Sequence, residues 1–367
     1  MKRLRIAVIA HLRHPIARPF AGGMEAHSWH LVRGLQARGH EVTLFAAGDS
    51  DPSLPLRPVL PRHYDADYPW HDFRGTELLN AALTHWHGSM MQDILSGGFD
   101  IVHNNGLHPL PLHTAARNRL AMLTSLHVPA FHSLQKAVRE CIAPWSHVTA
   151  CTARHLASYW SEPPPQAHIV ANGIDLADWP FRPHGNGEAV WAGRITPNKG
   201  THLAIAAARR TGMALTLFGA IEDWGYFRDH IRPVLKGPVR YGGHLTSRDL
   251  AAQIGKGSVA LFTPLWDEPF GLAAIEAMAC GLPVAAIRNG AVPEVIGAAG
   301  CYVAADETAL ATSIDSAVTI PRLVPRARVE RLFTLDRMLR NYEALYQCAI
   351  DGQGSWSRSN ADLSSAL

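Results

Sequence analysis

The sequence of 367 residues is poor in cysteine, in charge and in long apolar runs. Its five cysteines are scattered without a C-x-x-C pair, so neither a disulfide framework nor a zinc site is expected, and a reducing cytoplasm is the expected compartment. No apolar run approaches the roughly 20 residues of a membrane helix. The run from Ile6 to Ala10 ends at His11, which predicts a buried strand and not a signal peptide. A net charge of +3 without a basic cluster makes nucleic acid an unexpected partner.

The composition, with 47% hydrophobic and 18% charged residues, is typical of a globular enzyme, and the length suggests two domains. Short apolar runs alternate with amphipathic stretches, which predicts βα repeats and parallel sheets, and therefore an α/β fold. The predicted strands are 4–10, 41–46, 101–103, 122–126, 147–150 and 168–170 in the first half, and 189–192, 215–218, 239–241, 259–262, 284–287 and 302–303 in the second. Ligands of such sheets bind beyond the carboxyl ends of the strands.

A stretch rich in proline and glycine, residues 179–187, interrupts this alternation and is the best linker candidate. We therefore expect an N-terminal domain over residues 1–183 and a C-terminal domain over 184–334. A last helix, predicted over 335–350, follows the second sheet. The Ser- and Gly-rich residues 351–367 are expected to form a mobile tail.

The most informative segment is E-P-F-G-L-A-A-I-E-A-M-A-C-G-L-P, from Glu268 to Pro283. Its pattern predicts a short helix over 272–280, with Gly271 at the start and a glycine and a proline at the end. Free amides at a helix N-terminus attract phosphate. Glu276 lies in an otherwise apolar helix, so it needs hydrogen-bond donors, and the hydroxyl groups of a sugar would serve. The alternative is a buried structural carboxylate that pairs with an arginine.

Three further features suggest contacts with a ligand. Arg194 and Lys199 lie in a loop between glycines, a spacing that suits two cations folded onto one anion; the alternative is two solvated cations on a turn. Gly22 and Gly23 follow the first predicted strand and open a helix, which would let backbone approach a phosphate or sugar closely. His127 is predicted at the carboxyl end of a strand, where a structural histidine is the alternative. His103 has the same strand-end position and less support.

The ordered motifs E-P-F-G-L, E-A-M-A and G-L-P resemble the signature of retaining GT-B glycosyltransferases of family 4 (glycosyl transferases group 1). The resemblance implies two doubly wound Rossmann-like domains that face across a cleft, with the last helix crossing back to the first domain. It also implies a hexosyltransferase (EC 2.4) that moves a sugar from a UDP- or GDP-linked donor to an acceptor hydroxyl and retains the anomeric configuration. No cofactor and no metal are expected, although Asp65 and Asp67, and likewise His85 and His87, would otherwise suggest metal ligands.

The resemblance also assigns roles to residues. The family's diphosphate ligands correspond to Arg194 and Lys199, to the amides of Phe270, Gly271 and Leu272, and to the loop of Gly22 and Gly23. Glu276 corresponds to the ribose ligand, and Glu268 and His127 correspond to residues near the donor sugar. Residues 217–220 depart from the Gly-Asp-Gly-like turn that touches the base in the family, so the donor base stays open between uridine and guanosine.

Two other functions fit the same fold. One is a nucleotide-sugar epimerase, which needs no acceptor. The other is a catalytically silent subunit that keeps the donor pocket, although a silent copy has no reason to retain Arg194, Lys199, Glu268 and Glu276 together. The acceptor is expected to be a carbohydrate, a natural product or a lipid-linked hydroxyl, with at most peripheral membrane contact.

Overall fold

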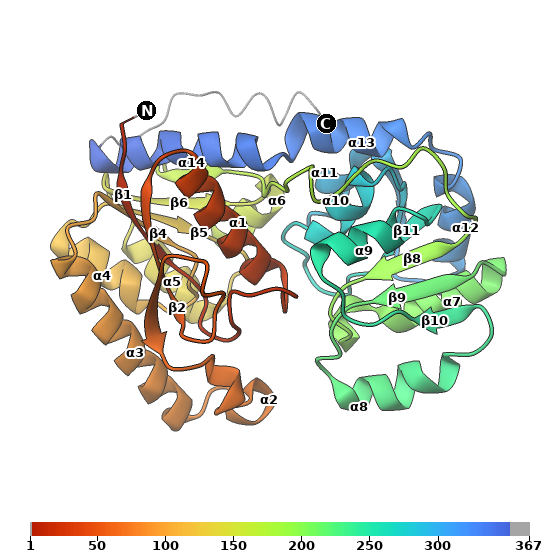
Figure 1. Ribbon diagram of the computed structural model, residues 1–367, viewed down its shortest axis with the longest axis horizontal. Helices are drawn as coiled ribbons and strands as arrows, with labels where there is room; N and C mark the ends of the chain where they lie inside the picture. Colours follow the sequence, from red (N-terminus) through yellow and green to blue (C-terminus); the bar gives the residue numbers. More distant parts are fainter. Residues whose placement is uncertain (1, 353–367) are drawn as a thin grey trace. The chain divides into compact units, whose positions relative to one another are not determined.

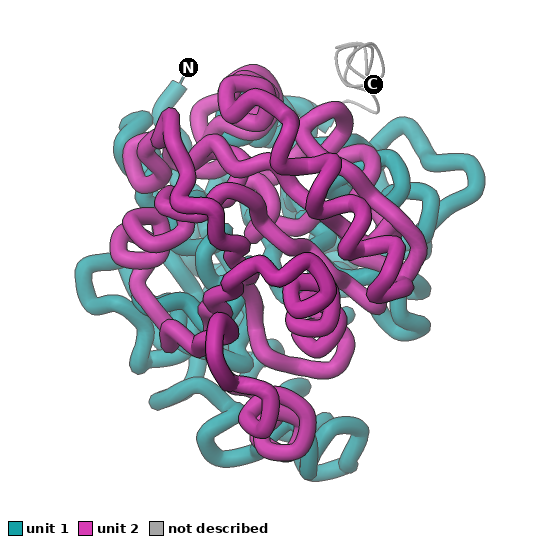
Figure 2. The backbone as a smooth tube through the Cα atoms, turned by 90° about the vertical axis from the view of Figure 1, so that its right-hand side faces the viewer, with its two compact units in different colours: residues 1–170, 338–360 teal, residues 171–337, 361–367 magenta. Residues whose placement is uncertain are grey.

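The computed structural model describes residues 2–352, which form two compact units (Figure 2). Within the described residues, unit 1 comprises those up to Val170 together with 338–352, and unit 2 comprises Ala171–Arg337. The predicted tail lies outside the described residues except for Asp351 and Gly352. Within residues 2–352, no helix combines the length and the apolar character needed to cross a membrane.

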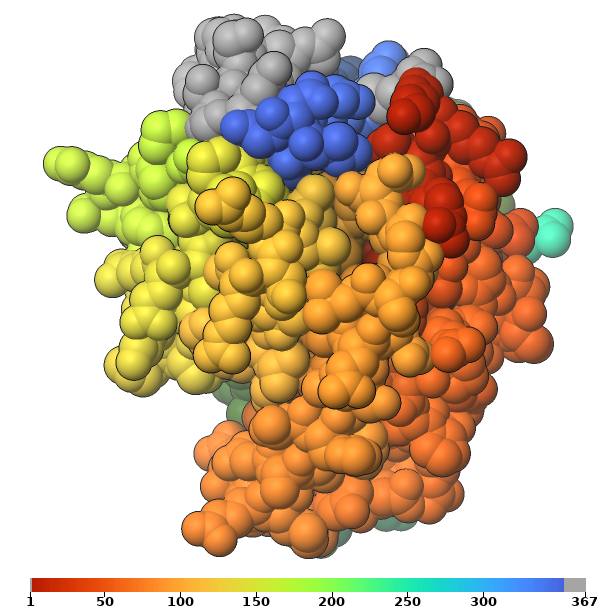
Figure 3. All heavy atoms as spheres, turned by 90° about the vertical axis from the view of Figure 1, so that its left-hand side faces the viewer, coloured from red at the N-terminus to blue at the C-terminus, as the bar shows by residue number. Residues whose placement is uncertain are grey.

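Unit 1 contains a parallel sheet of seven strands in the order β3-β2-β1-β4-β5-β6-β7 (Figure 1). Its strands are β1 (Arg5–Ile9), β2 (Glu41–Ala47), β3 (Leu56–Leu60), β4 (Ile101–Asn104), β5 (Met122–Ser125), β6 (Ser146–Ala150) and β7 (Ala167–Ile169). Its helices are α1 (Gly23–Ala37), α2 (Trp70–Phe73), α3 (Glu77–Ser96), α4 (Leu110–Asn118), α5 (His132–Glu140), α6 (Ala153–Tyr159) and most of α14 (Leu335–Ile350). Figure 3 shows this unit from the side of α3 and α4, in orange, with α14 in blue at the top.

Unit 2 contains a parallel sheet of six strands in the order β10-β9-β8-β11-β12-β13. Its strands are β8 (Ala189–Ala192), β9 (Leu215–Phe218), β10 (Val239–Tyr241), β11 (Val259–Phe262), β12 (Val284–Ile287) and β13 (Gly300–Val303). Its helices are α7 (Thr201–Thr211), α8 (Trp224–Tyr226), α9 (Ser247–Ile254), α10 (Leu272–Ala279), α11 (Val292–Ile296), α12 (Glu307–Ala317) and α13 (Leu323–Leu332). The interior strands β11 and β12 are buried along their whole length, as expected of a sheet covered by helices on both faces.

The predicted α/β class with two parallel sheets is confirmed, and every predicted strand is present. The boundary between the units differs from the expected division after residue 183. Residues 171–187 pack on unit 2 instead: Ile174 N–H donates to Phe333 O at 2.9 Å, Arg182 N–H donates to Cys280 O at 3.1 Å, and Trp179 is buried. The prolines and glycines of this stretch therefore shape a segment packed on unit 2 and not a free linker.

Candidate functional site

The loop after β8 packs closely against the residue that follows β11, and a glycine makes this close approach possible. Gly200 has φ +66°, and a Cβ atom there would lie 2.2 Å from Thr263 O, so only glycine fits. Thr263 Oγ1 donates to Lys199 O at 2.9 Å and accepts from Trp191 Nε1 at 3.0 Å. These contacts hold Lys199, in the 3-10 turn η2 (Pro197–Lys199), at the carboxyl edge of the sheet.

Lys199 and Glu268, which the sequence predicted as separate ligand contacts, form an ion pair. Lys199 Nζ donates to Glu268 Oε2 at 2.7 Å and lies 4.6 Å from the ring centroid of Trp266. Trp266 Nε1 donates to the same carboxylate oxygen at 2.7 Å. Among residues 2–352, Oε1 of Glu268 has no hydrogen-bond partner. Charge-assisted bonds of this kind fix a carboxylate in place, and they leave the free oxygen and the remaining ammonium protons for a ligand.

Arg194 also has a carboxylate partner, Glu222, which the sequence analysis did not single out. Nη1 of Arg194 donates to Glu222 Oε2 at 2.5 Å, and about a third of the arginine side chain is exposed. Glu222 follows β9, just after the segment that departs from the family's turn. Gly219 in that segment has φ +133°, and a Cβ atom there would lie 1.9 Å from Gly193 O. The loops after β8 and β9 are therefore in direct contact, and they bring Arg194 and Glu222 together.

The helix predicted after Gly271 is present as α10. Gly271 is its N-cap with φ +94°, and no side chain caps the helix. In the part of the chain that the structure describes, the amides of Leu272 and Ala273 have no hydrogen-bond acceptor. Phe270 is buried, with its ring 5.4 Å from that of Phe333, so the loop before the helix is anchored. The free amides can therefore donate to a ligand from a fixed position.

Glu276 lies one turn into α10 and is only partly exposed. Burial raises the pKa of Glu276 to about 7. No described residue gives its carboxylate a hydrogen bond or an ion pair, so the arginine partner considered above is not found. Arginines do approach α10, but Arg326 donates to Ala279 O at 2.9 Å and Arg322 to Cys280 O at 3.2 Å, both at the other end of the helix. Glu276 is a partly buried acid that lacks donors.

In unit 1, His127 follows β5 and is held by Asn105, which follows β4. His127 Nε2 lies 3.0 Å from Asn105 Oδ1, and its ring centroid lies 4.3 Å from that of His27. Burial, together with His27 and His155, holds the pKa of His127 well below its usual value. Gly22 is the N-cap of α1 in extended backbone, with no side-chain cap. The sequence analysis gave no role to Asn105 or His27.

His103, the weaker strand-end candidate, is a core residue. It is fully buried, and its two ring nitrogens lie 2.5 Å from Tyr346 Oη and 2.9 Å from Ser125 Oγ. Similarly, Asp65 pairs with Arg13 at 3.0 Å and Asp67 pairs with Arg62, so this pair of carboxylates is bound to arginines.

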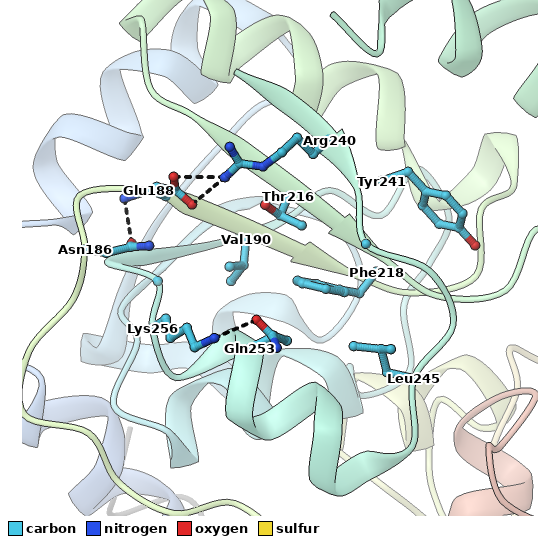
Figure 4. A pocket seen from close by; sticks show the side chains of 12 residues that line it. Asn186, Glu188, Val190, Thr216, Phe218, Arg240, Tyr241, Leu245, Gln253 and Lys256 are labelled. Atoms are coloured by element: carbon cyan, nitrogen blue, oxygen red, sulfur yellow. Dashed lines mark hydrogen bonds and ion pairs between the residues drawn. The ribbon is translucent and has the colours of Figure 1, made fainter. Parts of the chain in front are cut away.

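Unit 2 also contains a groove of about 380 Å³ that the sequence did not predict (Figure 4). Its lining includes the apolar side chains Val190, Phe218 and Leu245 and residues of β8, β9, β10 and α9. The charged side chains that line it are engaged: Arg240 pairs with Glu188 at 2.8 Å, and Lys256 donates to Gln253 at 3.0 Å. Phe218, one of its lining residues, directly precedes Gly219 in the chain.

Comparison with known proteins gives two adjacent family matches. Residues 21–178 match Glycosyltransferase Family 4, and residues 187–319 match Glycosyl transferases group 1. The first match spans β2 to β7, the second spans β8 to β13, and together they cover most of the chain.

Curated relatives include two kinds of match. The chain is 36% identical over 178 residues to a glycogen synthase of Mycobacterium tuberculosis. This match covers 44% of the present chain and 42% of the glycogen synthase, so the chain spans less than half of that relative's length. It is 27% identical to the MMP alpha-(1->4)-mannosyltransferase of Mycolicibacterium hassiacum, over 81% of this chain and 84% of that protein. It is 26% identical to the D-inositol 3-phosphate glycosyltransferase of Mycobacterium avium, over 82% of each.

Solved structures share the fold. A sucrose-phosphate synthase from Thermosynechococcus elongatus has a TM-score of 0.76 at 20% identity, covering 94% of this chain and 98% of its own. Anabaena Alr3699/HepE, solved with UDP and glucose, has a TM-score of 0.71 at 16% identity, covering 93% and 98%. At these identities the likeness concerns the architecture of the chain.

Proposed function

Because the chain belongs to the family 4, group 1 glycosyltransferases with the GT-B fold, we propose that it is a hexosyltransferase that moves a sugar from a nucleoside diphosphate sugar to an acceptor hydroxyl. One observation carries this proposal. The carboxyl edge of the sheet in unit 2 gathers two cationic side chains, two free helix amides and two carboxylates with unused acceptor atoms. A diphosphate with sugars on both sides has the complementary chemistry.

The diphosphate is assigned to Lys199, Arg194 and the first amides of α10. Lys199 has three ammonium protons, and only one is used by Glu268, so two can reach phosphate oxygens. When the glycosidic bond breaks, negative charge grows on the leaving phosphate. Fixed cations and amides therefore stabilise the transition state more than the bound donor, which lowers the barrier.

We assign the hydroxyl groups of the nucleotide sugar to carboxylate oxygens that have no hydrogen-bond donor among the described residues. Glu276 would accept from the ribose, and the free Oε1 of Glu268 would accept from the transferred sugar. His127 is proposed, from the family resemblance, as a further hydrogen-bonding group for the donor sugar. Gly22 and Gly23 complete the proposed donor contacts through backbone amides at the start of α1.

We also propose transfer with retention and without a metal cofactor. The cationic groups named above would neutralise the leaving phosphate, which is the role of the metal in other transferases. No side chain is assigned as a covalent nucleophile; instead, the departing phosphate oxygen would take the proton of the acceptor hydroxyl. A chelator should therefore leave the transfer rate unchanged, whereas a metal requirement would contradict this part of the proposal.

The donor base and the acceptor are proposed more broadly. UDP- and GDP-linked hexoses are the candidate donors, and UDP is the nucleotide bound in Anabaena Alr3699/HepE. The relatives are named for transfer to D-inositol 3-phosphate and for an alpha-(1->4)-mannosyl linkage, so a carbohydrate hydroxyl is the first acceptor to test, before natural products and lipid-linked sugars. Such donors are cytoplasmic, and we propose that compartment.

The test is a screen of UDP- and GDP-hexoses for binding, for slow hydrolysis and for transfer to a panel of sugar acceptors. We expect one donor to be hydrolysed, and its sugar to be released from the nucleotide. An epimerase would instead convert the sugar while it stays attached. A silent subunit would bind the nucleotide with no turnover. If calorimetry detects no nucleotide binding at all, the proposed function is wrong.

A further inference from the structure

The contact between His127 and Asn105 fixes where the histidine carries its proton. An amide oxygen can only accept a hydrogen bond, so the 3.0 Å contact to Asn105 Oδ1 requires a proton on Nε2 of His127. The other end of the amide, Nδ2, donates to Ser28 Oγ of α1 at 3.4 Å. Asn105 is fully buried, and its own N–H donates to Ile9 O at 2.8 Å. The amide is thus held from two sides.

The other ring nitrogen of His127, Nδ1, has neither a proton nor a hydrogen-bond partner among the described residues. The lowered pKa keeps the ring neutral near pH 7, so a proton on Nε2 leaves Nδ1 without one. Among residues 2–352, Nδ1 has no hydrogen-bond partner, and the side chain is partly exposed. His127 therefore presents an acceptor atom, and a hydroxyl group is the ligand chemistry that matches it.

We propose that Asn105 is a positioning residue that holds the Nε2–H form of His127, so that Nδ1 can accept a hydrogen bond from a hydroxyl of the bound sugar. The sugar in this inference rests on the proposed function. The tautomer of His127 rests only on its contact with Asn105. Asn105 touches no substrate in this account. It acts through the histidine, in the way that a carboxylate or carbonyl behind a catalytic histidine sets its tautomer.

The neighbouring titratable groups determine how this arrangement responds to pH. His27 from α1, His103 from β4 and His155 from α6 are the titratable side chains coupled to His127. All are histidines, so each disfavours a positive charge on His127. An aspartate at position 105 would reverse this balance, because a carboxylate beside Nε2–H stabilises the doubly protonated ring.

The experiment compares Asn105→Leu and Asn105→Asp with a matched control, Asn104→Asp. Asn104 is the adjacent residue and equally buried. Its Oδ1 accepts from Gly106 N–H, a role that an aspartate keeps, and within residues 2–352 its side chain makes no hydrogen bond with His127. Nitrogen-15 NMR of the histidine ring, assigned with His127→Gln, reports the tautomer and the titration in the ligand-free protein. Kinetics of donor hydrolysis report kcat and KM, and thermal melts confirm that each variant folds.

In the parent protein, His127 should be in the Nε2–H form. Asn105→Leu should lose this preference and lower kcat/KM about tenfold or more. Asn105→Asp should keep the tautomer and raise the pKa of His127. Its kcat/KM should therefore fall, as pH decreases, at a higher pH than in the parent. Asn104→Asp should change neither the tautomer nor the pH profile.

An unchanged His127 tautomer in Asn105→Leu would overturn the inference, and so would an equal kinetic loss in the Asn104→Asp control. A changed tautomer with unchanged kinetics would remove the role toward the sugar. If the parent protein binds no nucleotide sugar, the proposed function fails by itself, and the NMR measurement still decides whether Asn105 sets the tautomer.

Discussion

The sharpest prediction concerns Glu276, because its pKa of about 7 makes nucleotide binding depend on pH. If the carboxylate accepts hydrogen bonds from two ribose hydroxyls, only the ionised form binds well. About a tenth of the free protein is ionised at Glu276 at pH 6 and about nine tenths at pH 8, because each pH unit changes the ratio of the two forms tenfold. Nucleotide affinity should therefore rise about tenfold between pH 6 and pH 8, or by about 1.4 kcal/mol.

Glu276→Gln is the matched variant, since it keeps the shape and cannot ionise. At pH 8 it should bind UDP or GDP at least tenfold more weakly, because a hydrogen bond to a charged group contributes about 1.5–3 kcal/mol. Free nucleotide and donor should lose affinity together, since a ribose contact is the same before and during the reaction. The phosphate groups of the nucleotide titrate in both proteins, so the difference between the two pH profiles isolates Glu276.

The same group should destabilise the ligand-free protein. The pKa of Glu276 is raised from 4.5 to about 7, so the folded state binds more protons than the unfolded state between these values. Its contribution to the free energy of unfolding therefore falls as pH rises through this window. Because the side chain is partly exposed, we expect Glu276→Gln to be more stable than the parent by about 1–3 kcal/mol at pH 8 and unchanged near pH 4.

Isothermal titration calorimetry at pH 6 and pH 8 and urea unfolding of both proteins test this reasoning. Nucleotide affinity that is equal in the parent and in Glu276→Gln would make Glu276 a structural carboxylate and end the ribose assignment. Affinity that falls in the variant without losing its pH dependence would show that another group titrates. A variant that is less stable than the parent at pH 8 would mean that a hydrogen-bond partner compensates the carboxylate in the ligand-free protein.

Two other predictions concern Lys199 and the buried histidines. Lys199→Ala should lower kcat far more than donor affinity, because the negative charge that Lys199 meets grows in the transition state. The expected loss in kcat is about a hundred- to a thousandfold, or about 2.7–4 kcal/mol. A single-turnover rate within threefold of the parent would remove Lys199 from the mechanism. Burial lowers the pKa of His27, His87 and His103 from 6.5 to about 3, so each is neutral in the folded state and binds a proton on unfolding. The free energy of unfolding should fall as pH decreases below 6.5, by about 1.4 kcal/mol per pH unit for each histidine, and a flat profile in urea unfolding between pH 4.5 and 6.5 would contradict this.

The strands could be predicted from the sequence because they are short apolar runs separated by turns, and the one missed strand shows the limit of that rule. β3 (Leu56–Leu60) contains Pro58, which is exposed together with Arg57, and it forms the edge of the sheet in unit 1. A proline is tolerated there because the outer side of an edge strand needs no N–H donor. The sequence gives no sign of which strand will be the edge, so a short strand interrupted by an arginine and a proline is indistinguishable from a loop.

Individual side chains of the candidate site were predictable where a local motif marks them, and their partners were not. Lys199 and Glu268 are 69 positions apart, and they meet because β8 and β11 are neighbours in the sheet. Asn105 and His127 meet for the same reason, at the ends of β4 and β5. Strand order decides such pairs, and a pattern along one strand contains no information about its neighbours. His103 differs from His127 only in lying inside its strand, where the side chain points into the core.

The position of two arginines, Arg322 and Arg326, explains why Glu276 keeps an unpaired carboxylate although both cations approach α10. Arg322 donates to the carbonyls of Gly257, Gly255 and Cys280, and Arg326 to those of Trp179 and Ala279. Both guanidinium groups are therefore committed to the C-terminal end of α10, where positive charge stabilises the helix dipole. The N-terminal end keeps its free amides, and the carboxylate one turn later keeps its free oxygens. These two arginines thus bind the C-terminal end of α10, and the N-terminal end remains available to a ligand.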